Sequence, residues 1–351
     1  MAIPSKNYKN ILIVKLSAIG DVIHALPVAH ALKQRYPEAH LTWVVEKPAY
    51  DLLINNPDID EIIIFDKPKF KSVAGLIKNM PQLYKNLTRH RFDLAIDLQG
   101  LLKSSLIIAM SGATKNLGYC NMRELSHLIS EPVCGANSQG HVVDRYLDVA
   151  KFLGCDTKRV IFPIHFTAIE ISQTEFIAKE IGFNMDRPYV VLAPGTNWTT
   201  KCWPIRRFIE LVDKLLKKEI QVVIVGGPGD NHLSIEIQNQ FYSDAFLFNI
   251  TGQTSLKQLA YVIKKGAVFI GGDTGPMHLA VAVGTPVVAL FGPTDPKRNG
   301  PYQGENVVIQ PNRSCINCWR RECDIACLDE IEADTVLREI EKLLKKVNKF
   351  Y

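Results

Sequence analysis

The sequence lacks any uncharged apolar run of about 18 residues, the length that a transmembrane helix needs. Its first residues, Met1 to Lys6, contain neither the apolar run nor the small-residue cleavage site of a signal peptide. We therefore expect no transmembrane helix and a cytoplasmic protein.

Two functional signatures are also missing. No G-x-G-x-x-G fingerprint follows an expected strand, which argues against a nicotinamide-dependent dehydrogenase. The basic residues are dispersed and form no stripe with interleaved stacking aromatics, so we expect no nucleic-acid partner.

Positive charge is unevenly distributed along the chain. Residues 1–165 hold 20 Lys and Arg against 15 Asp and Glu, whereas the remaining residues hold 21 of each, so the net charge of +5 lies in the first half. A basic half suits an anionic partner such as a phosphorylated lipid or a membrane surface, although an excess of this size also occurs without such a partner.

Length and composition favour two packed domains. The 351 residues are about twice a common domain length, and 47% of them are hydrophobic. Strand-like apolar runs alternate with stretches of helical periodicity, which predicts an α/β fold with parallel, doubly wound sheets. The expected strands are residues 11–16, 41–46, 61–65, 94–98, 189–193, 221–225, 267–270 and 286–291. The main expected helices are residues 21–36, 73–89, 103–110, 141–153, 205–217, 256–264, 276–283 and 333–347. We expect two Rossmann-like domains, residues 1–170 and 171–332, facing a central cleft, with a helix over 333–351 that packs back toward the first domain.

The turn at residues 17–21 links the first strand to the first helix. Ligands of open α/β sheets bind where strands end, and Gly20 permits a close approach of the backbone. Asp21 stands at this point, either as an N-terminal cap of the helix or as a base that points to a ligand.

Three loops of the second half should open on one edge of its sheet. Residues 194–204 carry hydroxyls, an amide and Lys201, a set suited to a diphosphate. Residues 226–230 form a glycine-rich turn in which a nucleotide could lie. Residues 271–278 place two glycines, Asp273 and a helix start together, so that the amides of Thr274 and Gly275 would face a phosphate. The alternative for this last loop is a structural turn with a core histidine, His278.

In combination, four stretches resemble glycosyltransferase family 9, the ADP-heptose:lipopolysaccharide heptosyltransferases. They are residues 13–24, 97–104, 201–204 and 272–278, and the resemblance spans about residues 10–345. Residues 141–146 are similar to heptosyltransferase I, which adds the first heptose to the inner Kdo of Kdo2-lipid A.

The resemblance implies a GT-B architecture and an inverting, metal-independent transfer from ADP-heptose to that Kdo. It implies that Asp21 is the catalytic base and that Lys201 assists departure of the diphosphate. The implied donor-binding residues are Thr196, Asn197, Asp230, Asp273, Thr274, Gly275 and His278, and the implied acceptor-binding residues are Gln99, Arg123, His141 and Arg145. The motif around Asp230 is shifted from the family pattern.

The chemistry is consistent with these roles. A carboxylate takes the proton from the acceptor hydroxyl as the hydroxyl attacks the anomeric carbon, and a lysine with helix N-terminal amides stabilises the leaving ADP without a metal. No cofactor is expected. We expect an ADP-sugar donor, a Kdo2-lipid A acceptor, peripheral contact with the cytoplasmic face of the inner membrane, and a monomer.

The eight cysteines divide into two sets. Cys120, Cys134, Cys155 and Cys202 are scattered and are expected to be free thiols in a reducing compartment. Cys315, Cys318, Cys323 and Cys327 lie within one short segment, expected away from the cleft, and are either free or partly paired thiols or ligands of a structural metal.

Other functions stay open. A heptosyltransferase II or another family 9 transferase with a different acceptor is the main alternative. A non-catalytic nucleotide-sugar-binding protein is the other, and it would leave Asp21 without a catalytic role.

Overall fold

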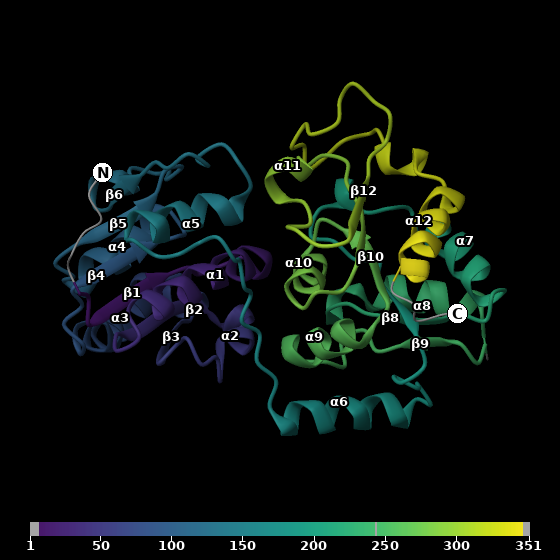
Figure 1. Cartoon of the computed structure of the whole chain (residues 1–351), viewed down its shortest axis with the longest axis horizontal. Helices are drawn as coiled ribbons and strands as arrows, with labels where there is room; N and C mark the ends of the chain where they lie inside the picture. Colours follow the sequence, from purple (N-terminus) through teal and green to yellow (C-terminus); the bar gives the residue numbers. More distant parts are fainter. Residues whose placement is uncertain (1–6, 243, 347–351) are drawn as a thin grey trace. The chain divides into compact units, whose positions relative to one another are not determined.

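The computed structural model describes residues 7–242 and 244–346. The chain forms two compact units that divide between His165 and Phe166. Helix α6 (Ala168–Glu180) belongs to the second unit, and the boundary expected at residue 170 lies inside it. Figure 1 labels the elements of both units.

The first unit contains a parallel six-stranded sheet with the order β3-β2-β1-β4-β5-β6. Its strands are β1 (Asn10–Val14), β2 (His40–Glu46), β3 (Glu61–Phe65), β4 (Leu94–Asp97), β5 (Asn116–Tyr119) and β6 (Glu131–Val133). The central strand β1 is buried from Ile11 to Val14. A run without alternating polar residues is typical of a strand covered on both faces.

Helices cover the two faces of this sheet. They are α1 (Ile19–Arg35), α2 (Lys47–Leu53), α3 (Val73–Thr88), α4 (Leu102–Ser111) and α5 (Val142–Phe152). Helix α1 packs against α5, and its buried residues include Val22, Leu26 and Ala29 at the expected helical spacing.

The second unit repeats this plan with the strand order β12-β11-β10-β7-β8-β9. Its strands are β7 (Tyr189–Ala193), β8 (Gln221–Ile224), β9 (Leu247–Asn249), β10 (Val268–Gly272), β11 (Val287–Leu290) and β12 (Asn306–Ile309). Besides α6, its helices are α7 (Ile205–Leu216), α8 (Asn231–Gln240), α9 (Leu256–Lys265), α10 (Gly275–Ala282), α11 (Pro296–Asn299) and α12 (Ala333–Lys346).

The predicted fold class, with two doubly wound Rossmann-like sheets, is confirmed. The strands that the sequence did not predict are β5, β6, β9 and β12, which lie at or next to sheet edges and have three or four residues each. Short, partly exposed strands carry too little apolar sequence to be recognised by pattern alone.

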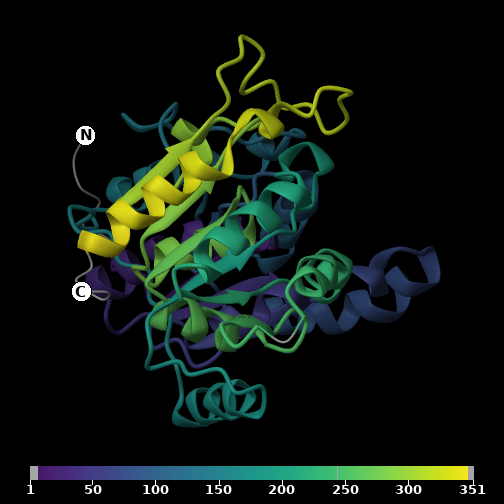
Figure 2. The same cartoon turned by 90° about the vertical axis from the view of Figure 1, so that its right-hand side faces the viewer.

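The C-terminal helix α12 belongs to the second unit. It packs on α7 and on the second sheet, and its apolar side joins the core of the second unit. In Figure 2, α12 lies alongside α7. Val336 and Ile340 are fully buried in that core.

Truncation of this buried side should destabilise the second unit. Ile340→Ala should cost about 2–5 kcal/mol of unfolding free energy because it removes packed methyl groups and leaves a cavity. Lys345→Ala on the exposed side of the same helix is the matched control. Urea unfolding followed by circular dichroism measures both variants, and equal midpoints would contradict the assigned packing.

Candidate active site

Each sheet has one point at which the strand order reverses. In the first unit it lies between β1 and β4, and in the second between β7 and β10. Loops that leave the carboxyl ends of these two strands diverge, and the resulting crevice is where open α/β sheets bind ligands. In both units, polar residues join the two loops.

Gln99 joins the loops of the first unit. Its Oε1 accepts hydrogen bonds from the amides of Leu16 at 3.0 Å and Ser17 at 3.1 Å. The carbonyl oxygen of the side chain therefore holds the turn that leads to Asp21. The structure gives Gln99 a positioning contact on this turn, beside the acceptor role that the resemblance implied.

Asp97 fixes the other side of this connection. Its Oδ1 accepts from the amides of Gln99 and Gly100, and its Oδ2 accepts from the hydroxyls of Ser104 and Ser105, at 2.7–3.2 Å. Burial raises the pKa of Asp97, although these hydrogen bonds act in the opposite direction. Asp97 thus anchors the loop that presents Gln99.

Asp21 lies in the first turn of α1 and is half-buried. Ala18, not Asp21, is the N-cap of the helix; Asp21 is its third residue, and its Oδ2 accepts a hydrogen bond from the amide of Ala18 at 3.2 Å. Within residues 7–242 and 244–346, Oδ1 has no hydrogen-bond partner. A carboxylate at a helix N-terminus is held in one orientation and keeps an oxygen for a ligand hydroxyl.

A buried cation near Asp21 was missed by the sequence analysis. The Nζ of Lys15, a residue only 2% exposed, donates to the hydroxyl of Tyr146 at 2.9 Å. The ring of Tyr146 lies edge-on to Tyr119, whose pKa burial raises to about 12, with Tyr146 and Asp21 adding to the rise and Lys15 and Arg123 opposing it. The available signal was a lysine at the end of an otherwise apolar strand.

Of the other implied acceptor residues, Arg123 lies in the loop after β5, where its amide donates to the carbonyl of Gly100 at 2.8 Å, and His141 and Arg145 lie at the start of α5. His141 precedes the helix, and its Nδ1 accepts from the amide of Val143 at 3.2 Å. Its ring lies edge-on to that of His24 in α1, with centroids 5.5 Å apart. Arg145 donates from Nε to the carbonyl of Gly140 at 2.8 Å. The structure thus places His141 beside α1, the helix that carries Asp21.

Three ionisable side chains meet at the switch point of the second unit. The Nζ of Lys201 lies 2.6 Å from Oδ2 of Asp273, and Nε2 of His278 lies 3.2 Å from Oδ1. Asp273 is 8% exposed. Burial alone would raise its pKa, but His278 and Lys201 outweigh burial and hold the pKa well below its usual range. Asp273 is therefore ionised at neutral pH.

The loop that carries Lys201 packs tightly on β10. A Cβ on Gly272 would lie 2.9 Å from the carbonyl oxygen of Lys201 and 3.2 Å from Thr196, so only glycine allows this approach. Thr196 shares its hydroxyl between the carbonyl of Trp198 and the sulfur of Cys202. Lys201 also lies 4.3 Å from the centre of the Trp198 ring, which adds a cation–π contact.

Helix α10 begins beside this cluster. Thr274 is its N-cap and Gly275 its first residue, with Pro276 in the first turn. Its first amides have no acceptor within the helix and point along its axis, an arrangement that favours anionic ligands. His278 is one turn further on the same helix, and the structure therefore brings Lys201, Asp273, Thr274, Gly275 and His278 together.

Asp230 and Asn197 are placed differently. Asp230 accepts from the amide of Gly227 at 2.8 Å, and its carboxylate covers Gly195, where a Cβ would lie 2.0 Å from Oδ1. It therefore closes the adjoining loops after β7 and β8. Asn197 is exposed in the loop after β7, and the structure gives it no contact with the charged cluster.

The cysteine segment lies closer to this site than expected. The amides of Asn317 and Trp319 donate to Gly292 and Pro293 in the loop after β11. The carbonyl of Arg320 accepts from Thr200 at 2.9 Å, and Arg321 stacks 4.8 Å from the centre of Trp198. The expectation that residues 315–327 lie away from the ligand loops is wrong, because the chain folds back over the carboxyl edge of the second sheet.

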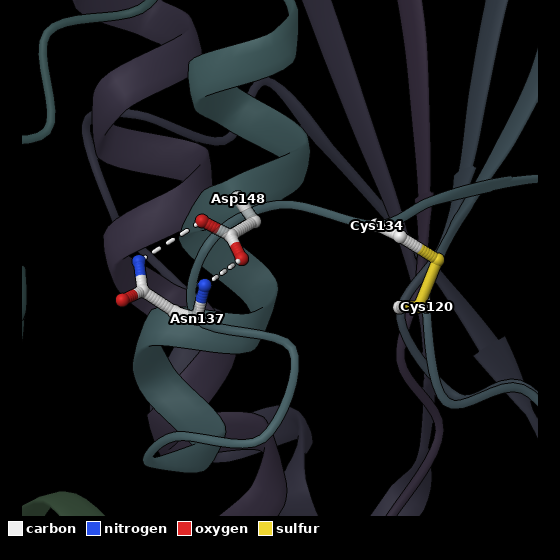
Figure 3. The surroundings of a disulfide bond; sticks show 4 residues. All are labelled: Cys120, Cys134, Asn137 and Asp148. Atoms are coloured by element: carbon white, nitrogen blue, oxygen red, sulfur yellow. Dashed lines mark hydrogen bonds between the residues drawn. A yellow bond between two sulfur atoms is a disulfide. The ribbon is translucent and has the colours of Figure 1, made fainter.

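One pair of cysteines also differs from expectation. Cys120 and Cys134 form a disulfide (Figure 3), whereas both were expected as free thiols. Tyr119 of β5 is the register partner of Val133 of β6, so the next residue of each strand lies opposite the other, with Cα atoms 4.6 Å apart. Figure 3 also shows Asp148 accepting two hydrogen bonds from Asn137 nearby.

Metal ligands were considered for two groups. Over the described part of the chain, the only three metal-ligating side chains with ligand atoms within 4.8 Å of one another are His40, Glu61 and His90. Arg89 already neutralises Glu61, and the group stands at the amino ends of β2 and β3, opposite the edge with Asp21. The second group considered is the cysteine segment, whose four sulfur atoms do not all lie within that distance of one another: Cys315, Cys318, Cys323 and Cys327.

Comparisons with known proteins agree with the geometry. Residues 80–328 match the model of glycosyltransferase family 9 (heptosyltransferase). The chain is 27% identical over 308 residues to the lipopolysaccharide core heptosyltransferase OpsX of Haemophilus influenzae, covering 86% of this chain and 84% of the relative. It is 28% identical over 342 residues to lipopolysaccharide heptosyltransferase 3 of Escherichia coli, covering 93% and 95%. The solved structure of E. coli ADP-heptose lps heptosyltransferase II matches with a TM-score of 0.79 at 23% identity, over 97% of this chain and 99% of that one.

The two sheets and their structural match define a GT-B glycosyltransferase fold. The family match covers well over half of the chain, and the protein belongs to glycosyltransferase family 9. Among the described residues, no helix is long and apolar enough to cross a membrane.

The Lys201–Asp273–His278 cluster predicts a specific acid sensitivity. Because the folded-state pKa of Asp273 is depressed, its stabilisation is present above the unfolded pKa and is lost as pH falls through the folded pKa. Asp273→Asn should therefore cost roughly 3 kcal/mol at pH 7, and the difference from wild type should shrink as pH falls below about 4. Urea unfolding from pH 7 to pH 3 measures this, with the exposed Asp156→Asn as control. A difference independent of pH would contradict the ion-pair assignment.

Proposed function

We propose that this protein transfers L-glycero-D-manno-heptose from ADP-heptose to the inner Kdo of Kdo2-lipid A in lipopolysaccharide core synthesis. One observation carries the proposal. The chain matches the family, and it places Lys201 beside the start of α10 at one switch point and the carboxylate of Asp21 at the other.

The second unit is proposed to bind the donor. Lys201 and the first amides of α10 provide positive charge for a diphosphate, while Asp273 accepts hydrogen bonds from sugar hydroxyls. When ADP departs, negative charge grows on its outer phosphate. Lys201, held in place by Asp273 and Trp198, would stabilise that charge without a metal or another cofactor.

The first unit is proposed to bind the acceptor and to supply the base. Asp21 would take the proton of the attacking Kdo hydroxyl while ADP leaves from the opposite face of the sugar, so that the anomeric configuration inverts. The charges of Lys15, Arg123 and Asp21 all act on the hydroxyl of Tyr119. Gln99 lies in the loop after β4, and His141 and Arg145 lie at the start of α5. Kdo carboxylates and lipid A phosphates match the charge of Lys15 and Arg123.

The acceptor distinguishes this proposal from its main alternative. Relatives of nearly equal identity are named for different acceptor steps, which keeps heptosyltransferase II and other core acceptors open. The similarity of residues 141–146 to heptosyltransferase I favours the inner Kdo. We further propose a monomer in the cytoplasm that contacts the inner membrane peripherally, with its acceptor in that membrane.

Removal of the proposed base should stop the chemistry and leave binding intact. Asp21→Asn should lower kcat about 10²- to 10⁴-fold with little change in the KM for ADP-heptose, because general-base assistance is lost. Asp156→Asn, an exposed change in the same unit, should leave kcat unchanged. ADP release with Kdo2-lipid A as acceptor is the assay, and near-normal turnover by folded Asp21→Asn would refute the role of Asp21.

Loss of the lysine charge should affect the leaving group. Lys201→Gln should lower kcat about 10²-fold and weaken ADP binding, since both the donor and the leaving ADP carry the diphosphate. The control is Lys297→Gln at the exposed start of α11. Calorimetric titration with ADP and steady-state kinetics give the two values. Unchanged ADP affinity together with unchanged kcat would exclude Lys201 from the donor site.

A further inference from the structure

Large apolar side chains are exposed on three neighbouring elements of the first unit. Val73 and Ile77 of α3 are 73% and 72% exposed, and Leu128 in the 3₁₀ turn Ser126–Leu128 is 73% exposed. The full set is Val73, Leu76, Ile77, Tyr84, Leu102, Leu106, Leu125 and Leu128. An apolar surface shared by several elements is unusual unless it meets a partner.

These side chains follow from how the helices sit on the sheet. Helix α4 packs against α3 and against the 3₁₀ turn, so the three elements adjoin. Leu83 and Leu87 bury one side of α3, and Val73, Ile77 and Tyr84 lie at helical spacing on the exposed side next to it. Leu102 and Leu106 are likewise one turn apart on the exposed side of α4.

Positive charge surrounds this apolar surface. Residues 67–89 contain five lysines and one arginine but no aspartate or glutamate. Lys69 pairs with Asp66, and Arg89 pairs with Glu61. In the described part of the chain no ion pair is formed by the other lysines, which are Lys67, Lys71, Lys78 and Lys85. The surface is thus apolar with an excess of unpaired positive charge.

The surface also lies at the edge of the sheet that carries Asp21. The segment with α3 follows the carboxyl end of β3, α4 follows β4, and the 3₁₀ turn follows β5. These strands are parallel to β1, so the three connections and the turn to Asp21 all start from the same edge. In Figure 2, α3 projects away from the rest of the first unit.

We propose that this apolar, lysine-bordered surface, the docking face, binds an anionic lipid bilayer. Val73, Ile77 and their neighbours would enter the boundary between headgroups and acyl chains, while the lysines meet lipid phosphates. The inference rests on the proposed function, because the proposed acceptor is itself a membrane lipid. Charge favours a bilayer over a second copy of the chain, since two copies of this face would repel each other.

Vesicle binding tests the docking face without any acceptor present. Vesicles of phosphatidylcholine with 30% phosphatidylglycerol should sediment the wild-type protein, whereas pure phosphatidylcholine should bind it at least about fivefold less, because roughly one lysine contact with anionic lipid is worth that factor. Binding should fall further at about 0.5 M salt, where charge is screened. Equal binding to both vesicle types, or no binding to either, would overturn the proposal.

A pair of exposed substitutions locates the contact. Val73→Ser with Ile77→Ser should weaken binding to the anionic vesicles at least about tenfold, because two apolar side chains no longer enter the bilayer. The control is Ile169→Ser with Phe176→Ser on α6, a pair 68% and 62% exposed in the second unit. Equal loss in both pairs would contradict the assignment to the docking face.

Activity separates this inference from the proposed function. The Val73→Ser, Ile77→Ser protein should keep its turnover with detergent-dispersed Kdo2-lipid A and lose it with acceptor embedded in vesicles. Normal vesicle binding in a wild-type protein that transfers no heptose would leave the docking face standing and reject the proposed reaction. A concentration-dependent dimer that the double substitution abolishes would assign the face to a second copy and overturn the membrane role.

Discussion

The ion pair between Lys201 and Asp273 joins the loops that follow β7 and β10, the two strands at which the strand order of the second sheet reverses. Its 2.6 Å contact is possible because Gly272 admits the Lys201 loop without a side chain in between. A buried carboxylate needs paired positive charge or hydrogen bonds, and here Lys201 from the loop after β7 and His278 from α10 both contact it. The pair therefore fixes the loop after β7 against the start of α10, and this gives the proposed diphosphate site its shape.

At the switch point of the first unit, hydrogen bonds connect the two loops. A neutral amide, Gln99, crosses the switch point and holds the turn before Asp21, while Asp97 holds the loop behind it. This difference suits the proposed division of labour. A leaving diphosphate calls for fixed positive charge, whereas a general base needs a carboxylate that can accept a proton.

The sequence predicted the central strands and the meeting of Lys201 with Asp273 because both depend on local pattern. Parallel strands end at one edge, so Lys201 and Asp273 could be expected together from loop positions alone. Contacts set by tertiary packing were not predictable in this way. The disulfide depends on the register of β5 and β6, and the path of residues 315–327 depends on hydrogen bonds to Gly292 and Pro293. Lys15 contacts Tyr146, which lies on a helix distant in the sequence, and the position of α12 depends on its packing against α7.

The central claim is that transfer requires a donor held by the second unit and a lipid acceptor held by the first. Measurement of ADP release from purified protein, with ADP-heptose and Kdo2-lipid A supplied together and separately, tests it most directly. The account predicts ADP release at a catalytic rate only when both are present, with heptose attached to the inner Kdo in the product. ADP release of equal rate without the acceptor, or no release with both, would contradict it.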